Sequence, residues 1–570
     1  MKFNEMTYTR PDFEEAKKNY EELFKNFKDQ SLEEQIATIN EWNKESDDFA
    51  TNATLCSVRH SIDTRDEFYE KETEYFDEVG PLFSNLAVEA NKTILSSTHL
   101  EDLKKHFGSH YFEILECSLV MKEEAIPFMQ KENALVTKYN KLIASAKIEF
   151  DGKTNTLAQM GPYTQVADRA KRKEAHEAVT KFFEENEAEF DKIYDDLVKV
   201  RNEMALALGY KNYVELQYKF LYRTDYNSED VKRYREYIYK NFTPLAVKLR
   251  EKQAERIGLK DDFKYYDWGF SFKEGNPNPI GDPEFIVNQA IKMYHELSKE
   301  TGEFIDVMTG MDLMDLVAKP GKQAGGYCTD IPNYKVPFIF SNFNGTQGDV
   351  EVVTHEAGHA FQVYSSRNMI VPEYRWPTYE ACEIHSMSME FITWPWMELF
   401  FGDAVDRFKY SHLSGAIEFL PYGVTIDEFQ HFVYENPEAT PEERKKKYHE
   451  IEMKYRPNVD YADNEFLKKG TFWYRQGHVF NTPFYYIDYT LAQVCAFQFL
   501  IKSLEDREKA FDEYLTLCKA GGSESFFGLM KIGKLENPMV EGTLEKIIPK
   551  LEEIVWGEIF CLICRESRES

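Results

Sequence analysis

Cysteine is scarce in this chain. Eight cysteines are spread irregularly over 570 residues, whereas a small disulfide-stapled fold needs a denser and more regular set. Such sparse cysteines are typical of free thiols in a reducing compartment. Cys561 and Cys564 form the one CxxC pair. Because a structural zinc site needs a second pair of ligands, we expect this pair to belong to the last helix and not to a metal site.

The chain also lacks long apolar runs and clusters of basic residues. No stretch of about eighteen uncharged apolar residues occurs, and the N-terminal MKFNEMTYTRPDFEEAKKNYEELF has no apolar segment of the kind found in secretory signals. The sequence therefore predicts a cytoplasmic protein with no membrane partner. A formal net charge of −30 without Lys/Arg-rich runs argues against nucleic-acid binding. The oligomeric state has no marker in the sequence.

Helical periodicity, by contrast, is abundant. In residues 11–27 apolar residues recur at spacings of three and four behind Pro11, the pattern of an amphipathic helix. Similar patterns fill most of residues 60–145, and residues 168–210 predict one or two long helices that end at Gly209. Since a chain of this length exceeds the size at which a single core stops growing, we expect at least two lobes with a cleft between them.

Two segments predict β-structure. AKIEFDGKTNTLAQM (146–160) alternates around Asp151-Gly152, which predicts a tight hairpin near a lobe boundary. AGGYCTDIPNYKVPFIFSN (324–342) is rich in aromatic and β-branched residues and predicts a small sheet. An exposed strand here could pair with an extended peptide, so the candidate substrate-binding residues are Gly325, Gly326 and Tyr327. An ordinary hairpin packed on helices explains the same pattern equally well.

The stretch VVTHEAGHAF (352–361) contains an HExxH pattern. We expect it on a helix over residues 347–366, with His355 and His359 one turn apart on the same face. Two imidazoles at this spacing can bind one zinc ion, and Glu356, turned by about 100°, faces the open coordination position as a base for water. Composition alone produces HExxH in roughly three of a hundred such chains, so the pattern needs a third ligand.

The third ligand does not follow the metzincin pattern, because Gln362 and Ser365 stand where that pattern needs Gly and His. A second helix carrying a glutamate would complete a His, His, Glu zinc site. In the otherwise apolar segment TYEACEIHSMSMEF (378–391), burial near a cation explains the acidic residues better than solvent exposure does. Spacing alone does not decide among the three glutamates of this segment, Glu380, Glu383 and Glu390.

Together, HEAGHAF, EIHSMSME and HVFNTPFYYIDY resemble the oligoendopeptidase F group of thimet-oligopeptidase-like zinc metallopeptidases. The similarity also includes FDGKTNTLAQM, RNEMALALGYKNYVE and GGYCTDIP, so it covers most of the chain from about residue 140. By position, the resemblance implies that His355, His359 and Glu383 bind one Zn²⁺ and that Glu356 is the general base. Glu380 and Glu390 are then candidates to accept the second N–H of the ligating imidazoles.

The third motif matches family positions that stabilise the oxyanion, which implies this role for His478, Tyr486 and Tyr489. In the family a Gly-rich loop precedes the tyrosines, but the interval here is VFNTPF, with Pro483 and no glycine. Tyr485 is therefore a rival to Tyr486 and a candidate substrate-binding residue. Without the zinc motif, an aromatic core stripe would explain YYIDY equally well.

The resemblance implies a mainly α fold in which two helical lobes enclose a deep substrate channel, with a small antiparallel β-sheet beside the zinc site and a gluzincin-like HExxH helix. Residues 1–140 are expected to form an N-terminal helical lobe, and residues 141–570 a catalytic region that completes both sides of the channel. The implied activity is hydrolysis of internal bonds in short unfolded peptides by zinc-activated water. Two alternatives stay open: a zinc exopeptidase, and a non-catalytic peptide-binding protein with a structural zinc.

Overall fold

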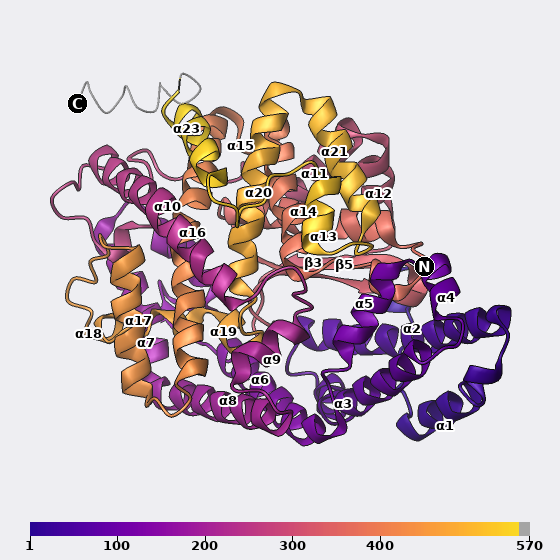
Figure 1. Ribbon diagram of the computed structural model, residues 1–570. Helices are drawn as coiled ribbons and strands as arrows, with labels where there is room; N and C mark the ends of the chain where they lie inside the picture. Colours follow the sequence, from indigo (N-terminus) through magenta and orange to yellow (C-terminus); the bar gives the residue numbers. More distant parts are fainter. Residues whose placement is uncertain (558–570) are drawn as a thin grey trace.

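The structure, a computed structural model, describes residues 1–557, and helices dominate it (Figure 1). Cys561 and Cys564 lie outside the described residues. No helix in residues 1–557 combines the length and apolar character that a membrane span requires. The expected amphipathic helix near the N-terminus is present as α1 (Phe13–Leu23), which begins where the Asp12 side chain accepts the backbone N–H of Glu15.

The other N-terminal helices extend along the lower right and the base of the molecule in the view of Figure 1. Ser31 and Glu34 form a capping box at the start of α2, which fixes the beginning of this long helix. The helices of this region are α2 (Leu32–Ile62), α3 (Glu67–Leu95), α4 (Leu100–Phe107), α5 (Ser109–Ser118) and α6 (Ile126–Ala144).

The predicted hairpin is confirmed. Strands β1 (Ile148–Phe150) and β2 (Lys153–Asn155) pair antiparallel, and Asp151 and Gly152 between them have φ angles of 53° and 73°. Positive φ at both central residues is what a two-residue hairpin turn requires. The helices that follow are α7 (Arg169–Glu185), α8 (Glu187–Ala207), α9 (Tyr213–Phe220), α10 (Ser228–Arg256), α11 (Pro283–Leu297) and α12 (Lys299–Gly310).

The segment predicted as a sheet supplies two of three strands. Strand β3 (Met314–Val317) precedes β4 (Tyr327–Ile331) and β5 (Val336–Phe343), and the spatial order is β3-β5-β4. Strands β4 and β5 pair antiparallel, but β3 and β5 pair parallel. The expectation of an antiparallel sheet is therefore wrong for β3: two chain reversals return β5 to the direction of β3, and β5 lies between the other two strands. Strand β4 is at the edge of the sheet, and among the described residues no strand pairs with its other side.

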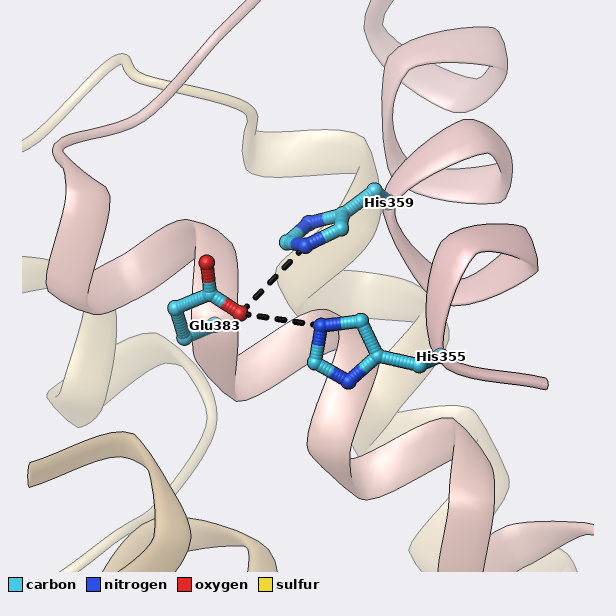
Figure 2. A group of neighbouring side chains, drawn as sticks. All are labelled: His355, His359 and Glu383. Carbon is cyan, nitrogen blue, oxygen red and sulfur yellow. Dashed lines mark ion pairs between the residues drawn. The ribbon is translucent and has the colours of Figure 1, made fainter. Parts of the chain in front are cut away.

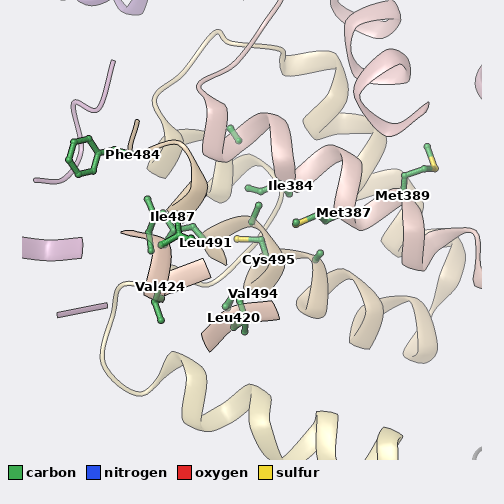
Figure 3. Packing of buried hydrophobic residues seen from close by; sticks show 14 of the residues in the cluster. Ile384, Met387, Met389, Leu420, Val424, Phe484, Ile487, Leu491, Val494 and Cys495 are labelled. Carbon is green, nitrogen blue, oxygen red and sulfur yellow. The ribbon is translucent and has the colours of Figure 1, made fainter. Parts of the chain in front are cut away.

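Three helices form a core next to the HExxH helix α13 (Gly348–Ser366), and one of them, α14, packs directly on α13. Side chains from α14 (Tyr379–Ile392), α16 (Val405–Glu435) and α20 (Tyr486–Glu505) meet there (Figure 3), and Ile384, Leu420 and Leu491 are fully buried. Each such side chain stabilises the fold by about 1.5–3 kcal/mol relative to an exposed one. The core thus holds the glutamates of α14 and the tyrosines of α20 in fixed positions.

The remaining helices complete the part of the chain that the structure describes. They are α15 (Glu398–Phe401), α17 (Pro441–Tyr455), α18 (Glu465–Lys468), α19 (Gly477–Asn481), α21 (Arg507–Ala520), α22 (Phe526–Ile532) and α23 (Thr543–Trp556). The main hydrophobic cluster includes Phe3 and Val58 as well as Val555, so it joins both sides of residue 140. The division of the chain at residue 140 stays a prediction.

Candidate active site

Helices α13 and α14 bring the three predicted metal ligands together (Figure 2). His355 and His359 point from one face of α13 toward Glu383 on α14, and the three possible ligand atoms lie within 4.8 Å of one another. Oε2 of Glu383 is 3.2 Å from Nε2 of His355 and 3.3 Å from Nε2 of His359. A tetrahedral zinc ion with bonds of 2.0–2.1 Å separates its ligand atoms by roughly 3.3 Å. The residues present therefore fit a zinc ion.

The protonation state of Glu383 also suits a metal ligand. Burial alone would raise the pKa of Glu383, but the facing imidazoles of His359 and His355 hold it well below its ordinary value. The Ser386 hydroxyl donates to Oε2 at 2.9 Å and fixes the carboxylate. Three candidate ligands would leave one of the four tetrahedral positions of a zinc ion open, the number of protein ligands found in catalytic zinc sites.

Glu356 follows the first histidine and is buried, with 6% of its surface exposed. Within the described residues its Oε2 has no hydrogen-bond partner. Burial raises the pKa of Glu356, and the charges of His355 and His359 offset this only in part. A buried carboxylate without a partner costs stability, so its presence beside the ligands indicates a chemical use.

Gly326, the residue directly before the edge strand β4, lies close to the Glu356 side chain. A Cβ atom on Gly326 would lie 3.2 Å from Oε1 of Glu356 and 3.4 Å from the Phe340 carbonyl, so glycine allows this close approach. Gly325 has a φ of 91°, in the left-handed region. The Tyr327 ring stacks on Phe340 at 4.8 Å, so its backbone and not its side chain faces the free edge of β4.

Glu390 accepts a hydrogen bond from one imidazole of the candidate metal site. His355 donates from Nδ1 to Oε1 of Glu390 at 2.7 Å, which leaves Nε2 of His355 as the acceptor for a metal. The second oxygen of Glu390 is 2.6 Å from Nε2 of His412 on α16. Nδ1 of His412 accepts the indole N–H of Trp394 at 2.9 Å, so Nε2 of a neutral His412 carries the proton.

Sequence reasoning missed His412 and Trp394. Neither belongs to a motif, and they reach Glu390 only through the packing of α16 on the segment after α14. The hydrogen bonds that link Trp394, His412, Glu390 and His355 in series fix the orientation of the His355 ring. The tautomers of the two histidines follow because an indole nitrogen can only donate.

Replacing His412 with Asn is expected to lower zinc affinity by roughly 10- to 100-fold, the usual cost of losing an outer partner of a ligating group. Competition with a fluorescent chelator measures the affinity directly. His295→Asn is the matched control, because His295 is exposed on α11 and pairs with Asp306. Equal zinc affinity of H412N and the unchanged protein would show that this series of hydrogen bonds does not help to hold His355 in place.

Glu380 does not contact either ligating imidazole, contrary to expectation. Its Oε1 accepts the Tyr226 hydroxyl at 3.2 Å, and Nδ1 of His359 has no hydrogen-bond partner among the described residues. Glu380 lies one turn closer than Glu383 to the start of α14, where Tyr226 donates to it. Arg223 beside it pairs with Asp488 at 2.7 Å, so these groups form a separate buried cluster.

In the segment HVFNTPFYYIDY (478–489), the tyrosine that faces Glu383 is not the one expected from the family resemblance. The Tyr485 hydroxyl donates to Oε1 of Glu383, so Tyr485 and not Tyr486 reaches this candidate ligand. The reason is local: Phe484 has a φ of 64°, and α20 begins only at Tyr486. Tyr485 and Tyr489 then lie four residues apart on one face with stacked rings, whereas the Tyr486 ring packs edge-on against Phe419.

His478 lies beside this face of α20. Its Nε2 is 3.0 Å from the Tyr489 hydroxyl oxygen. Burial lowers the pKa of His478 to about 4, so its imidazole is neutral at pH 7.

Two cavities are lined in part by residues that neighbour the three candidate ligands. One of about 470 Å³ is lined by Cys328 and Thr329 of β4 and by Cys382, the neighbour of Glu383. The other, of about 430 Å³, is lined by Glu390 and by the His478 and Tyr489 pair.

A helical fold with an HExxH helix and a glutamate on a following helix that faces both histidines is typical of zinc metallopeptidases of the gluzincin type. Comparison with known sequences is more specific. Residues 3–121 match the Peptidase M3 N-terminal domain and residues 162–547 match Peptidase family M3, so the chain belongs to peptidase family M3.

Solved structures agree with this assignment. Pz peptidase A, solved with an inhibitor, is 51% identical with a TM-score of 0.96, over 97% of this chain and 99% of that one. Two proteins provisionally named oligoendopeptidase F are also similar. The first is 50% identical with a TM-score of 0.96, and the second, from Bacillus anthracis strain Ames, is 48% identical with a TM-score of 0.91; each covers 97% of this chain and 98% of its own. A comparison with curated proteins finds no match.

Proposed function

We propose that this metallopeptidase is a zinc oligoendopeptidase that hydrolyses internal peptide bonds of short, unfolded peptides. The observation that carries the proposal is the triad of His355, His359 and Glu383 with the unpartnered carboxylate of Glu356 beside it. The similarity to proteins named oligoendopeptidase F over nearly the whole chain supports the substrate class.

One Zn²⁺ would be held by Nε2 of His355, Nε2 of His359 and the Glu383 carboxylate. When bound, it supplies Lewis-acid chemistry that polarises the scissile carbonyl and lowers the pKa of water. A purely structural zinc site would normally have four protein ligands, often including cysteine. Three ligands with a buried acid beside the open position favour a catalytic role.

Glu356 is the proposed general base. Its free Oε2 takes a proton from the attacking water and then passes that proton to the leaving amine. Burial raises the pKa of Glu356, which makes its carboxylate a stronger base than one in water. Since the same group handles both proton transfers, no covalent acyl-enzyme is needed.

The oxyanion that forms on the scissile carbonyl needs a hydrogen-bond donor that is already in place. Tyr489, supported by His478, is the proposed donor. Tyr485 already donates to Oε1 of Glu383 and so holds this ligand in position. Tyr486, which lines the second cavity, has contacts that fit a wall of the substrate site better than an oxyanion donor.

Substrate backbone is proposed to lie along the free edge of β4, where main-chain groups provide hydrogen bonds independent of sequence. An antiparallel peptide would run from Ile331 toward Gly326, because β4 runs in the opposite direction. Its scissile bond would then meet Glu356 beside Gly326, and its N-terminal side would lie over the cavity lined by Cys328 and Thr329.

A cytoplasmic location is part of the proposal. The six cysteines within residues 1–557 are free thiols, as expected in a reducing compartment. The net charge of −30 argues against nucleic acid as a partner.

A quenched fluorescent peptide of about ten residues, acetylated at one end and amidated at the other, tests the proposal against the exopeptidase alternative. An endopeptidase cuts such a peptide internally, because recognition relies on backbone and side chains and not on a free terminus. Mass spectrometry identifies the bond, and the same peptide with free ends is the control. Cleavage of the free peptide alone would favour an exopeptidase.

A further inference from the structure

His478 contacts two partners that together define the position of its proton. Nε2 of the Gln476 side chain is 2.9 Å from Nδ1 of His478, and the Tyr489 hydroxyl oxygen is 3.0 Å from Nε2. A neutral imidazole has one N–H donor and one acceptor nitrogen. An amide nitrogen only donates, so Nδ1 of His478 is the acceptor and Nε2 carries the proton.

The orientation of the Gln476 amide follows from its other contact. The Tyr422 hydroxyl donates to Oε1 of Gln476 at 3.0 Å. Burial raises the pKa of the Tyr422 hydroxyl, and the nearby positive charges of Arg456 and Arg475 offset this only in part. Tyr422 therefore keeps its proton and can donate it to Gln476. The amide oxygen therefore faces Tyr422 and the amide nitrogen faces His478.

We propose that Gln476 is a positioning residue that fixes the Nε2–H tautomer of His478 and thereby keeps the hydroxyl proton of Tyr489 free for the substrate. In this tautomer His478 donates to the Tyr489 oxygen, and Tyr489 donates its own proton to the developing oxyanion. The inference rests on the proposed function, because it assigns Tyr489 as the oxyanion donor.

The opposite tautomer would disable the donor without moving any heavy atom. If Nδ1 carried the proton, Nε2 would accept from Tyr489, and the tyrosine proton would point at His478. A hydroxyl that donates to Nε2 cannot also donate to the substrate. Through its hydrogen bond to His478, and the bond from His478 to Tyr489, Gln476 thus determines whether the Tyr489 proton is available to the oxyanion.

The first test locates the protons in the zinc-loaded enzyme. Neutron diffraction is expected to show hydrogen on Nε2 of His478, none on Nδ1, and the NH₂ group of Gln476 facing Nδ1. Hydrogen on Nδ1 would overturn the proposal. This measurement does not depend on turnover, so it stands or falls separately from the proposed peptidase activity.

The second test is kinetic and uses Gln476→Glu, which keeps the shape and the contact with Tyr422 but replaces the donor with an acceptor. The carboxylate draws the proton to Nδ1, so kcat is expected to fall by roughly 10- to 100-fold, somewhat less than the full loss of one oxyanion donor. KM should change by less than about twofold, because ground-state contacts are kept. Tyr489→Phe should show a loss of kcat of similar or larger size.

Combining the two substitutions provides the decisive comparison. In a Y489F background, Q476E should cause little further loss, because both changes remove the same donor. Gln30→Glu is the matched control: Gln30 lines neither cavity, and its Oε1 accepts the Thr38 hydroxyl at 3.0 Å, a contact that a carboxylate can keep. An equal loss in Q30E, or an undiminished loss from Q476E in the Y489F background, would overturn the proposal.

Discussion

Replacing Glu356 with Gln is expected to reduce kcat for peptide cleavage by roughly 10²- to 10⁴-fold, the range that a positioned general base contributes. The amide keeps the shape of the side chain but cannot take the proton from water. Because Oε2 of Glu356 has no hydrogen-bond partner within residues 1–557, the fold should tolerate the change. Initial rates with the doubly blocked peptide give the loss, and metal analysis gives the zinc content.

Two controls separate the base from the metal in this experiment. Zinc content of E356Q should stay at one ion per chain, since Glu356 is not among the three residues whose possible ligand atoms lie within 4.8 Å of one another. The melting temperature should be unchanged or higher, because a buried carboxylate without a partner destabilises the unaltered protein. Turnover within tenfold of the original, with zinc bound, would remove Glu356 from its proposed role.

Replacing Glu383 with Gln should lower zinc affinity by more than the replacement of His412 does. Losing a residue that only hydrogen-bonds to a metal-binding group lowers affinity by roughly 10- to 100-fold. The carboxylate loses its negative charge at the oxygen that lies nearest to both imidazole nitrogens. Peptide cleavage should fall in parallel and return in part when zinc is added in excess. Chelator competition measures the affinity, and rates over a zinc series measure the rescue.

Glu380→Gln is the matched control for this substitution. Glu380 is on the same helix, is equally buried and carries the same functional group, but its partner is Tyr226 and not an imidazole. Its replacement should leave zinc affinity within about threefold of the original. If E380Q weakened zinc binding as much as E383Q, the assignment of Glu383 as the third ligand would be wrong.

Local patterns were sufficient to predict the helices and the hairpin. The apolar spacing behind Pro11 predicted α1, and Asp151-Gly152 predicted the turn between β1 and β2. HExxH spacing placed both histidines on one face of a helix, because that relation depends only on the helical repeat. The choice of Glu383 needed the family resemblance, since three glutamates share the second helix.

Features that depend on tertiary packing were not predictable from local patterns. The parallel pairing of β3 results from β5 lying between β3 and β4, which no single segment encodes. Whether Tyr485 or Tyr486 faces Glu383 depends on the left-handed conformation of Phe484, a residue type that rarely adopts it. His412 and Gln476 belong to no recognised pattern, and only hydrogen bonds across the fold connect them to the site.

The most direct test of zinc-dependent internal cleavage of short peptides is mass spectrometry of the products from a peptide mixture graded in length and blocked at both ends. The account predicts internal cuts in the short peptides, a decline with length, no digestion of a folded protein, and complete loss with a chelator that added zinc reverses. Cleavage that persists with the chelator, or that is independent of peptide length, would contradict it.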